Sequence, residues 1–195
     1  MKQIFKTIDD YVIETANTIN KTWNTTTGKT RLDLSIYSHI LGGAANTLGS
    51  LYTYAEPVPI YQKALLNNPL LAIPLAFLAT TTFITSSYLI QRGEERNKDK
   101  TTKDFLTYFL KINKRIGSYA FPLTAGFLAL KGAYTDNQSA EHQQANTYAI
   151  VSMLSHGLGE IIMLAEDRPP QKNIIKKTLE LLVTPFKQLA YQTTH

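Results

Sequence analysis

A chain of 195 residues with 44% apolar residues is long enough for one domain, or for two small ones. Because it contains no Cys, disulfide bonds, thiolate metal sites and cysteine nucleophiles are excluded. The formal net charge of +5 is typical of a protein that meets nucleic acid or an anionic membrane surface. The distribution of the charges along the chain therefore has to decide between these two classes.

The first segment, residues 1–31, predicts an amphipathic helix followed by a polar turn. Apolar side chains recur at helical spacing from residue 4 to Trp23, and Lys and Asp side chains occupy the other side of the helix. Such a helix either lies on a membrane surface, with Trp23 at the interface, or packs against its own protein. The sequence favours neither alternative.

Residues 34–55 carry no formal charge and predict the first of four membrane-spanning helices. The stretch contains His39 and Asn46, and it is rich in Gly, Ala, Ser and Thr. Small residues let helices approach closely in lipid, where packing drives their association. We therefore expect this span to lie tightly against another helix.

The most apolar part of the chain is residues 64–91, which contain no Asp, Glu, Lys or Arg. A helix needs about 20 apolar residues to cross a hydrocarbon core of about 30 Å, so we predict the second span at residues 69–91. Eight Lys and Arg residues follow between Arg92 and Arg115. These basic residues predict a solvent-exposed connection between the second and third spans. Within it, residues 105–112 are apolar enough to form a short surface helix.

Two further spans are predicted at residues 116–134 and 147–165, the second of which carries His156 and Glu160. Residues 169–195 then predict a C-terminal amphipathic helix, because apolar and basic side chains alternate there at helical spacing. The predicted fold is all-α. Four transmembrane helices form an up-down bundle over residues 32–168, flanked by amphipathic helices at both termini.

The Lys and Arg residues divide unevenly between the two ends of this predicted bundle. Five precede the first span, eight lie between the second and third spans, and five follow the fourth. Only Lys63 and Lys131 fall in the two opposite connections. Since cytoplasmic loops carry the excess of Lys and Arg, we predict an integral membrane protein with both termini in the cytoplasm.

A short internal similarity indicates that the bundle consists of two repeated helical hairpins. Residues 89–96 and 161–168 each end an apolar stretch with two acids, and an Arg closes both segments. Two hairpins in the same orientation would form a parallel repeat. Chance similarity is an open alternative for segments this short.

Ionisable residues inside a predicted span are candidates for a functional site. His156 and Glu160 are four residues apart and share a helix face, and Ser152 lies one turn before them. Counting about 1.5 Å per residue from the cytoplasmic ends puts His39 level with Glu160, and Asn46 near His156. We therefore predict that the first and fourth spans are neighbours. The polar seam between them would contain His39, Asn46, Ser152, His156 and Glu160.

The residues of this seam are compatible with two kinds of chemistry. His39, His156 and Glu160 could hold a metal ion or relay a proton. Catalytic zinc sites use three protein ligands and a water, and these three residues are the only candidates. The other interpretation, which the small number of ligands favours, is a hydrogen-bonded patch that fixes helix packing. No cofactor can be inferred.

The predicted function is a non-enzymatic interaction or transport-type module of a membrane. Two alternatives stay open: an intramembrane enzyme that uses the His/Glu site, and a soluble helical bundle that binds an apolar ligand. The expected partners are the lipid bilayer, whose anionic headgroups meet the basic segments, and a membrane protein or a second copy of the chain. Nucleic acid is not favoured, because a membrane surface equally explains the aromatic residues between 92 and 115.

Overall fold

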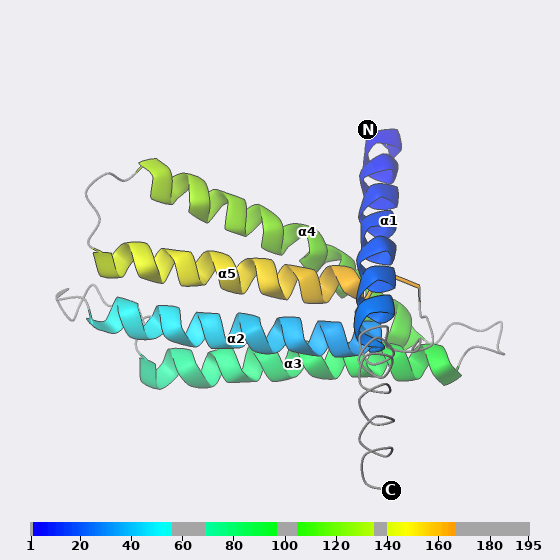
Figure 1. The fold of residues 1–195 in the computed structure, drawn as a ribbon, viewed down its shortest axis with the longest axis horizontal. Helices are drawn as coiled ribbons and strands as arrows, with labels where there is room; N and C mark the ends of the chain where they lie inside the picture. Colours follow the sequence, from blue (N-terminus) through cyan, green and yellow to red (C-terminus); the bar gives the residue numbers. More distant parts are fainter. Residues whose placement is uncertain (1, 56–68, 97–104, 135–139, 167–195) are drawn as a thin grey trace, which may run out of the picture.

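The computed structural model describes residues 2–55, 69–96, 105–134 and 140–166. Within these ranges the regular structure is entirely helical, which confirms the predicted all-α class. The helices are α1 (Lys2–Thr27), α2 (Arg31–Ala55), α3 (Pro69–Arg96), α4 (Phe105–Tyr134) and α5 (Ala140–Ile162). Helices α2 to α5 form a bundle, and α1 stands across one end of it (Figure 1).

The four bundle helices alternate in direction, so each runs antiparallel to the one before it (Figure 1). Helix α2 packs against α5 and α3, and α4 packs against α5 and, less extensively, against α3. The closest pair is α2 with α5. Helix α2 contains the predicted first span and α5 most of the predicted fourth, so the predicted proximity of these two segments is confirmed.

A tight turn sets α1 across the end of the bundle. Gly28 has a φ of 71°, a left-handed conformation that favours glycine, and its amide donates to the carbonyl of Asn24 at 2.8 Å. Helix α2 then starts with a capping box. The Thr30 amide donates to the carboxylate of Asp33 at 2.8 Å, and the Asp33 amide donates to the hydroxyl of Thr30 at 3.3 Å.

The structure corrects several predicted boundaries, including those of α5, which runs from Ala140 to Ile162 instead of from residue 147 to 165. Helix α3 continues to Arg96, beyond the predicted end at residue 91. Residues 105–112 are not a separate surface helix, because they are the first turns of α4, which runs unbroken to Tyr134. One buried stripe explains the continuity: Thr107, Lys114, Ser118 and Ala125 repeat at helical spacing along its whole length. The predicted C-terminal helix lies outside the described residues.

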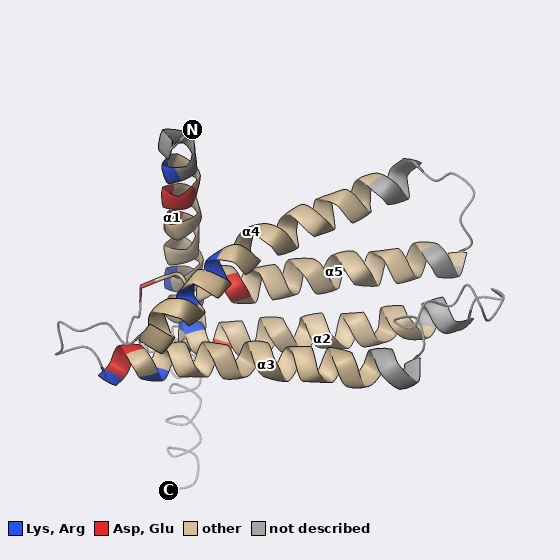
Figure 2. Cartoon of the chain, turned by 180° about the vertical axis from the view of Figure 1, so that it is seen from behind, with Lys and Arg blue, Asp and Glu red and all other residues tan. Residues whose placement is uncertain are grey.

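Charged side chains gather at the end of the bundle where α1 lies, which we call the charged end (Figure 2). The rest of the bundle contains four stretches without Asp, Glu, Lys or Arg: residues 34–55, 69–91, 116–130 and 143–159. We call these four stretches the charge-free region. Because the helices are antiparallel neighbours, the four stretches lie beside one another.

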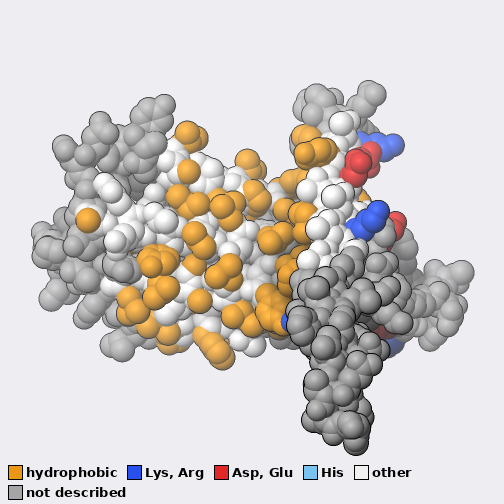
Figure 3. Space-filling view, viewed as in Figure 1, with side chains coloured by type: hydrophobic (Ala, Val, Ile, Leu, Met, Phe, Trp, Pro, Cys, Tyr) orange, Lys and Arg blue, Asp and Glu red, His pale blue; other side chains and the backbone are white. Residues whose placement is uncertain are grey.

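The polarity of the bundle is inverted relative to a soluble protein. Among the described side chains, eight buried residues are hydrophobic and 15 are polar or charged, whereas 24 large hydrophobic residues are exposed. Figure 3 shows apolar atoms spread over the bundle surface. Soluble monomers bury most of their large apolar residues and rarely expose apolar patches of this extent.

Of the described helices, one segment is long and apolar enough to cross a membrane, namely Ile73–Arg96 of α3. Only 17% of its most apolar window is buried, so it is not an interior helix surrounded by protein. Small residues let this segment pack closely against α2 and α4. Gly43 of α2 packs against Thr80, and Gly93 packs against Thr107 of α4, so closely that a Cβ atom at either glycine would overlap the threonine hydroxyl.

Candidate functional site: a buried Lys–Glu–His–His cluster

Four ionisable side chains meet in the interior of the bundle, where the charge-free region joins the charged end. His39 comes from α2, Lys114 from α4, and His156 and Glu160 from α5. Their relative exposures are 0%, 1%, 6% and 3%, so water does not solvate them. We call these four residues the buried cluster.

The buried cluster is a continuous chain of polar contacts. The Lys114 ammonium donates to Oε1 of Glu160 at 2.7 Å and to the carbonyl of Phe83 at 3.3 Å. Nε2 of His39 lies 3.3 Å from the same Oε1, within ion-pair distance but outside hydrogen-bond geometry. On the other side of the ring, Nδ1 of His39 lies 3.0 Å from Nδ1 of His156. Every member therefore touches the next.

The contacts of His39 favour one arrangement of hydrogen atoms. Nε2 faces a carboxylate oxygen, so a hydrogen on Nε2 is favourable and a lone pair there would be repelled. A neutral ring protonated at Nε2 accepts at Nδ1, and His156 must then donate from its own Nδ1. The donors of the cluster thus point in one direction, from His156 through His39 to Glu160.

Two phenylalanine rings enclose the histidine pair. Phe83 of α3 stacks on His39, with ring centroids 5.2 Å apart and planes 17° apart, and lies 5.0 Å from His156. Phe121 of α4 lies 5.8 Å from His156 on another side. Apolar walls lower the local dielectric, which strengthens the hydrogen bonds inside and makes an unpaired charge costly.

Three glycines make room for three members of the buried cluster. A Cβ atom at Gly42 would lie 2.8 Å from the His156 ring, and one at Gly159 would lie 2.7 Å from the His39 ring. A Cβ atom at Gly117 would lie 3.0 Å from the Glu160 side chain. Each glycine sits on a helix other than the one that carries the side chain it accommodates. The small residues of these helices thus make room for the buried cluster, in addition to letting the helix backbones pack closely.

Hydroxyl groups extend the polar contacts to α3. Ser35 of α2 donates to the carbonyl of Gly159 at 3.0 Å, and its Oγ lies 2.9 Å from Oγ of Ser87. Both serines are fully buried. The interior between α2, α3 and α5 is therefore polar on the side of the cluster that faces the charged end.

The structure brings together three of the five residues of the predicted seam, namely His39, His156 and Glu160. Ser152 is also buried, one turn before His156 on α5. Asn46 does not join them: it is half-buried, and no hydrogen bond between its side chain and His156 is found in this described part of the chain. The predicted level of Asn46 is wrong because His39 itself contacts His156, and Asn46 lies seven residues, about 10.5 Å, further along α2.

Lys114 is the member of the cluster that sequence reasoning missed, because it stands in a run of basic residues assigned to a wet connection. A signal was present in the spacing. Lys114 lies seven residues after Thr107 and four before Ser118, in the stripe of small and polar residues along which α4 packs. A lysine in such a stripe is directed toward the bundle interior.

The contacts of the cluster do not favour a metal ion. Among the residues that the structure describes, no three His, Cys, Asp or Glu side chains are grouped so that they could hold one. The oxygen of Glu160 that faces His39 is already bound by the Lys114 ammonium. A second cation beside that ammonium would be repelled.

A second buried charge lies at the charged end. The Arg31 guanidinium contacts the side chains of Gln91 and Glu94 on α3 and the carbonyls of Met163 and Ala165 after α5. Glu94 also pairs with Lys111 of α4. We call these contacts the Arg31 clamp. It joins the ends of α2, α3, α4 and α5.

Helix α1 is fixed to the bundle by polar contacts at two places. Asp9 pairs with Arg115 at 2.8 Å and accepts from the Tyr119 hydroxyl at 2.9 Å. Asn20 donates to the carbonyl of Glu166 at 2.9 Å, and the Glu166 amide donates to Asn17 at 2.8 Å. These contacts link α1 to α4 through side chains, and to the residues that follow α5.

The candidate site rests on this geometry, since no protein-family model, curated protein or solved structure matches the chain.

Proposed function

We propose that this chain is an integral membrane protein in which α2 to α5 cross a bilayer and the buried cluster binds and relays protons in a small transport-type module. The inverted polarity of the bundle is the observation that carries the membrane part of this proposal. In lipid, exposed apolar side chains are solvated and polar groups have to find partners inside the protein. The exposed leucines and phenylalanines and the buried serines and histidines match that requirement.

The helix lengths support four spans. Helices α2 to α5 contain 25, 28, 30 and 23 residues. At 1.5 Å per residue each is about 35–45 Å long, more than the roughly 30 Å of a hydrocarbon core. The charge-free region covers most of this length in α2, α3 and α5, and half of it in α4. It would occupy the hydrocarbon, and the charged end would lie in water.

Inward-facing residues explain why only α3 is apolar enough on average to pass as a span. On α2, α4 and α5 the polar residues of the charge-free region include Ser38, His39, Ser118 and Ser152, all of which are buried. Mean hydropathy counts them although they would not meet lipid. Most large outward residues of the same helices are apolar, as Leu41, Leu123 and Leu154 illustrate.

The position of α1 supports the same arrangement. It crosses the charged end at a large angle to the bundle, as a helix lying in the plane of a membrane surface would (Figure 1). Figure 3 shows apolar atoms on the side of α1 that faces the charge-free region, and charged side chains on its opposite side. The excess of Lys and Arg at this end favours the cytoplasmic side, so both termini would be cytoplasmic.

The chain of contacts in the buried cluster supports proton transfer. A proton taken up at Nε2 of His156 can leave from its Nδ1 to Nδ1 of His39. The Nε2 proton of His39 passes to Glu160 when these two groups, 3.3 Å apart in the structure, reach hydrogen-bond geometry. His156 and His39 are then neutral in their other tautomers, and Glu160 carries the added proton. Only protons move in this sequence. Chains of acids and histidines inside a membrane mark proton pathways in pumps and transporters.

Membrane insertion is tested first, by alkaline carbonate extraction of membranes that contain the full chain. The proposal expects the protein in the pellet and its release by detergent alone. Because the chain has no Cys, Thr101→Cys and Asn137→Cys each give a single label site. A membrane-impermeant maleimide added outside should label position 137 and spare position 101. Protein recovered in the cytosol would favour the soluble bundle and overturn the proposal.

Proton transfer is tested in liposomes that contain the purified protein and a pH-sensitive dye. An imposed membrane potential should drive faster acidification with the protein than without it, and Glu160→Gln should abolish the difference. Glu95→Gln is the matched control, since it removes the same charge from an exposed carboxylate on α3. Equal proton flux in the wild type and in Glu160→Gln would refute the relay. The buried cluster would then have only a structural role in helix packing.

A further inference from the structure

A cavity of about 1080 Å³ lies between α1 and α4, outside the buried cluster. Its size exceeds the roughly 300–1,000 Å³ of common small-ligand pockets. Its lining includes Lys6, Asp9 and Val12 of α1 and Arg115, Tyr119 and Leu123 of α4. The cavity thus occupies the angle between the helix that crosses the charged end and the surface of the bundle.

The two parts of this cavity differ in chemistry. Val12, Pro122, Leu123 and Ile161 supply an apolar part, and the Leu123 side chain is 73% exposed although it adjoins α1. Lys6 and Arg115 supply two cations, against the single carboxylate of Asp9. The charged part of the lining therefore has a net positive charge, and the rest resembles the apolar surface of the bundle.

Arg115 is held in place at the charged part of the cavity. Its guanidinium pairs with Asp9 at 2.8 Å, and Asp9 also accepts from the Tyr119 hydroxyl. The Arg115 side chain is nevertheless 48% exposed, so donors of its fork remain accessible. A guanidinium with several donors can bind a phosphate and a carboxylate at the same time.

We propose that this cavity binds one anionic phospholipid, with its phosphate at Arg115 and Lys6 and its acyl chains along Val12 and Leu123. The inference rests on the proposed membrane arrangement, in which α1 lies at the cytoplasmic surface. Basic pockets beside transmembrane helices on that side bind anionic headgroups. Tyr11 and Tyr119 line the cavity at the depth where aromatic residues mark a membrane interface.

The test is native mass spectrometry of the full chain, purified in detergent and offered equal amounts of phosphatidylglycerol and phosphatidylcholine. The wild type should retain phosphatidylglycerol preferentially. Each of Lys6→Gln and Arg115→Gln should lower that preference by about fivefold, since one Lys or Arg near a membrane surface attracts anionic lipid with about that factor. Arg92→Gln is the matched control, because it removes an exposed cation of α3 that lies outside the cavity.

A second variant tests the apolar part. Val12→Trp should fill the cavity and reduce retention of both lipids, with the charged part intact. Unchanged retention in this variant, or an equal loss of preference in Arg92→Gln and Arg115→Gln, would overturn the site. Displacement of phosphatidylglycerol by soluble glycerol 3-phosphate at equal concentration would also overturn it, in favour of a simple phosphate site.

A protein segment in the cavity, instead of a lipid, would give a different experimental result. A crosslink from Leu123→Cys to a second copy, or to a cysteine placed in residues 169–195, would show protein there instead of lipid. The proposed function is judged separately by carbonate extraction. Release by carbonate with lipid preference intact would refute the membrane arrangement alone, and firm insertion without any preference would refute the lipid site alone.

Discussion

The Arg31 clamp and the buried cluster both use a buried cation and a carboxylate to join helices, but they differ in their chemistry. The Arg31 clamp contains a guanidinium that lies among two side chains and two backbone carbonyls. The buried cluster contains a lysine, a glutamate and two histidines. Arginine keeps its proton in proteins, whereas lysine, glutamate and histidine can each gain or lose one.

The charge of the Arg31 clamp is therefore fixed, whereas the charges within the buried cluster can change. The Arg31 clamp keeps the same charge in any surroundings, and its partners include the carbonyls of Met163 and Ala165, which directly follow α5. The buried cluster can redistribute a proton among four adjoining groups without moving a helix. The first arrangement suits a structural role, and the second suits the proton transfer proposed above.

Removal of the fixed charge should have the largest effect. Arg31→Met leaves Glu94 and the carbonyls after α5 without their buried donor, so the free energy of unfolding in detergent should fall by about 3–5 kcal/mol. Arg31→Lys should recover part of this loss, because it restores the charge but not the planar fork. Arg92→Ala, at an exposed arginine, should change stability by less than about 0.5 kcal/mol. A similar loss in Arg31→Met and Arg92→Ala would show that the Arg31 clamp is not structural.

Removal of the carboxylate from the buried cluster should cost less. Glu160→Ala should lower the free energy of unfolding by about 2–3 kcal/mol, because Lys114 can respond by giving up its proton, whereas the carbonyls that lose their donor in Arg31→Met cannot change their charge. His39→Ala should add little to Glu160→Ala, because the two residues share one interaction. Losses that simply add in the double variant would disprove the coupling of His39 with Glu160.

Adding a Cβ atom at one of the closely packed glycines should have a smaller effect on stability. Gly159→Ala forces a Cβ atom against the His39 ring and should destabilise the protein by about 1–3 kcal/mol. Gly126→Ala is the matched control on α4, where a Cβ atom meets nothing within 4 Å, and it should stabilise the helix by about 0.5–1 kcal/mol. Chemical unfolding of both variants measures the contrast. Effects of the same sign would contradict this account of the packing.

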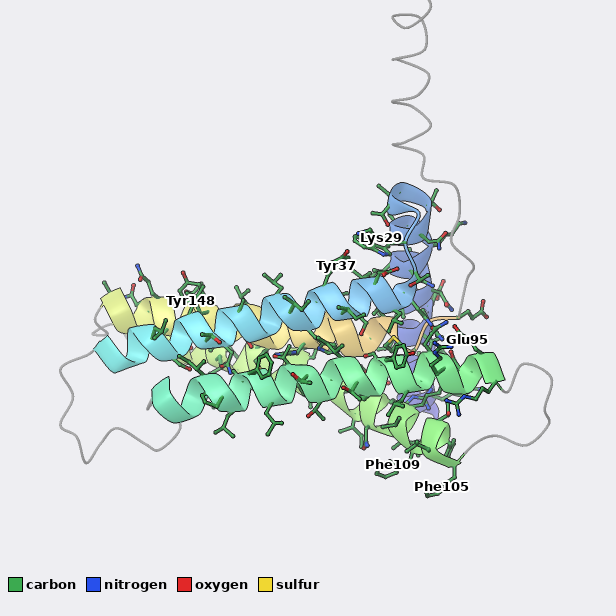
Figure 4. The ribbon with its side chains drawn as sticks, turned by 90° about the horizontal axis from the view of Figure 1, so that it is seen from below. Lys29, Tyr37, Glu95, Phe105, Phe109 and Tyr148 are labelled. Atoms are coloured by element: carbon green, nitrogen blue, oxygen red, sulfur yellow. The ribbon has the colours of Figure 1, made fainter. Side chains whose placement is uncertain are left out.

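The smallest effect is expected at Lys29, a solvated cation at the charged end of the bundle. The Lys29 ammonium donates to the Tyr37 hydroxyl at 2.6 Å, and this hydrogen bond raises the pKa of Lys29 above its ordinary value (Figure 4). Tyr37→Phe keeps the ring and removes the hydroxyl, so the pKa of Lys29 should fall. Titration of the lysine side chain by NMR measures the change. An unaltered pKa would show that the hydroxyl contact is not maintained in solution.

The sequence was sufficient for the neighbouring helices and for one contact of the site. Charge-free lengths located α2 and α5, and the depths of His39 and Glu160 predicted that they would meet, because both could be counted from charged ends at one level. His156 and Glu160 share a face by helical spacing alone. These inferences depended on local periodicity and on distances along single helices.

Lys114 and the Arg31 clamp could not be found in the same way. A run of basic residues looks identical whether one of its members is solvated or buried, and only the packing of α4 against α3 and α5 buries Lys114. Phe105 and Phe109, which begin the same helix, instead point outward (Figure 4). The partners of Arg31 are 60 to 134 residues away, beyond any local pattern.

The ion pair between Lys114 and Glu160 also constrains how the protein could be made. The two residues are 46 positions apart, so at 5–20 residues per second Glu160 is synthesised about 2–9 s after Lys114. A helix that entered a bilayer during this interval would carry an unpaired lysine at its edge. Under the proposed membrane arrangement, α4 and α5 would therefore have to leave the insertion machinery together as a hairpin, with the charge neutralised before it meets lipid.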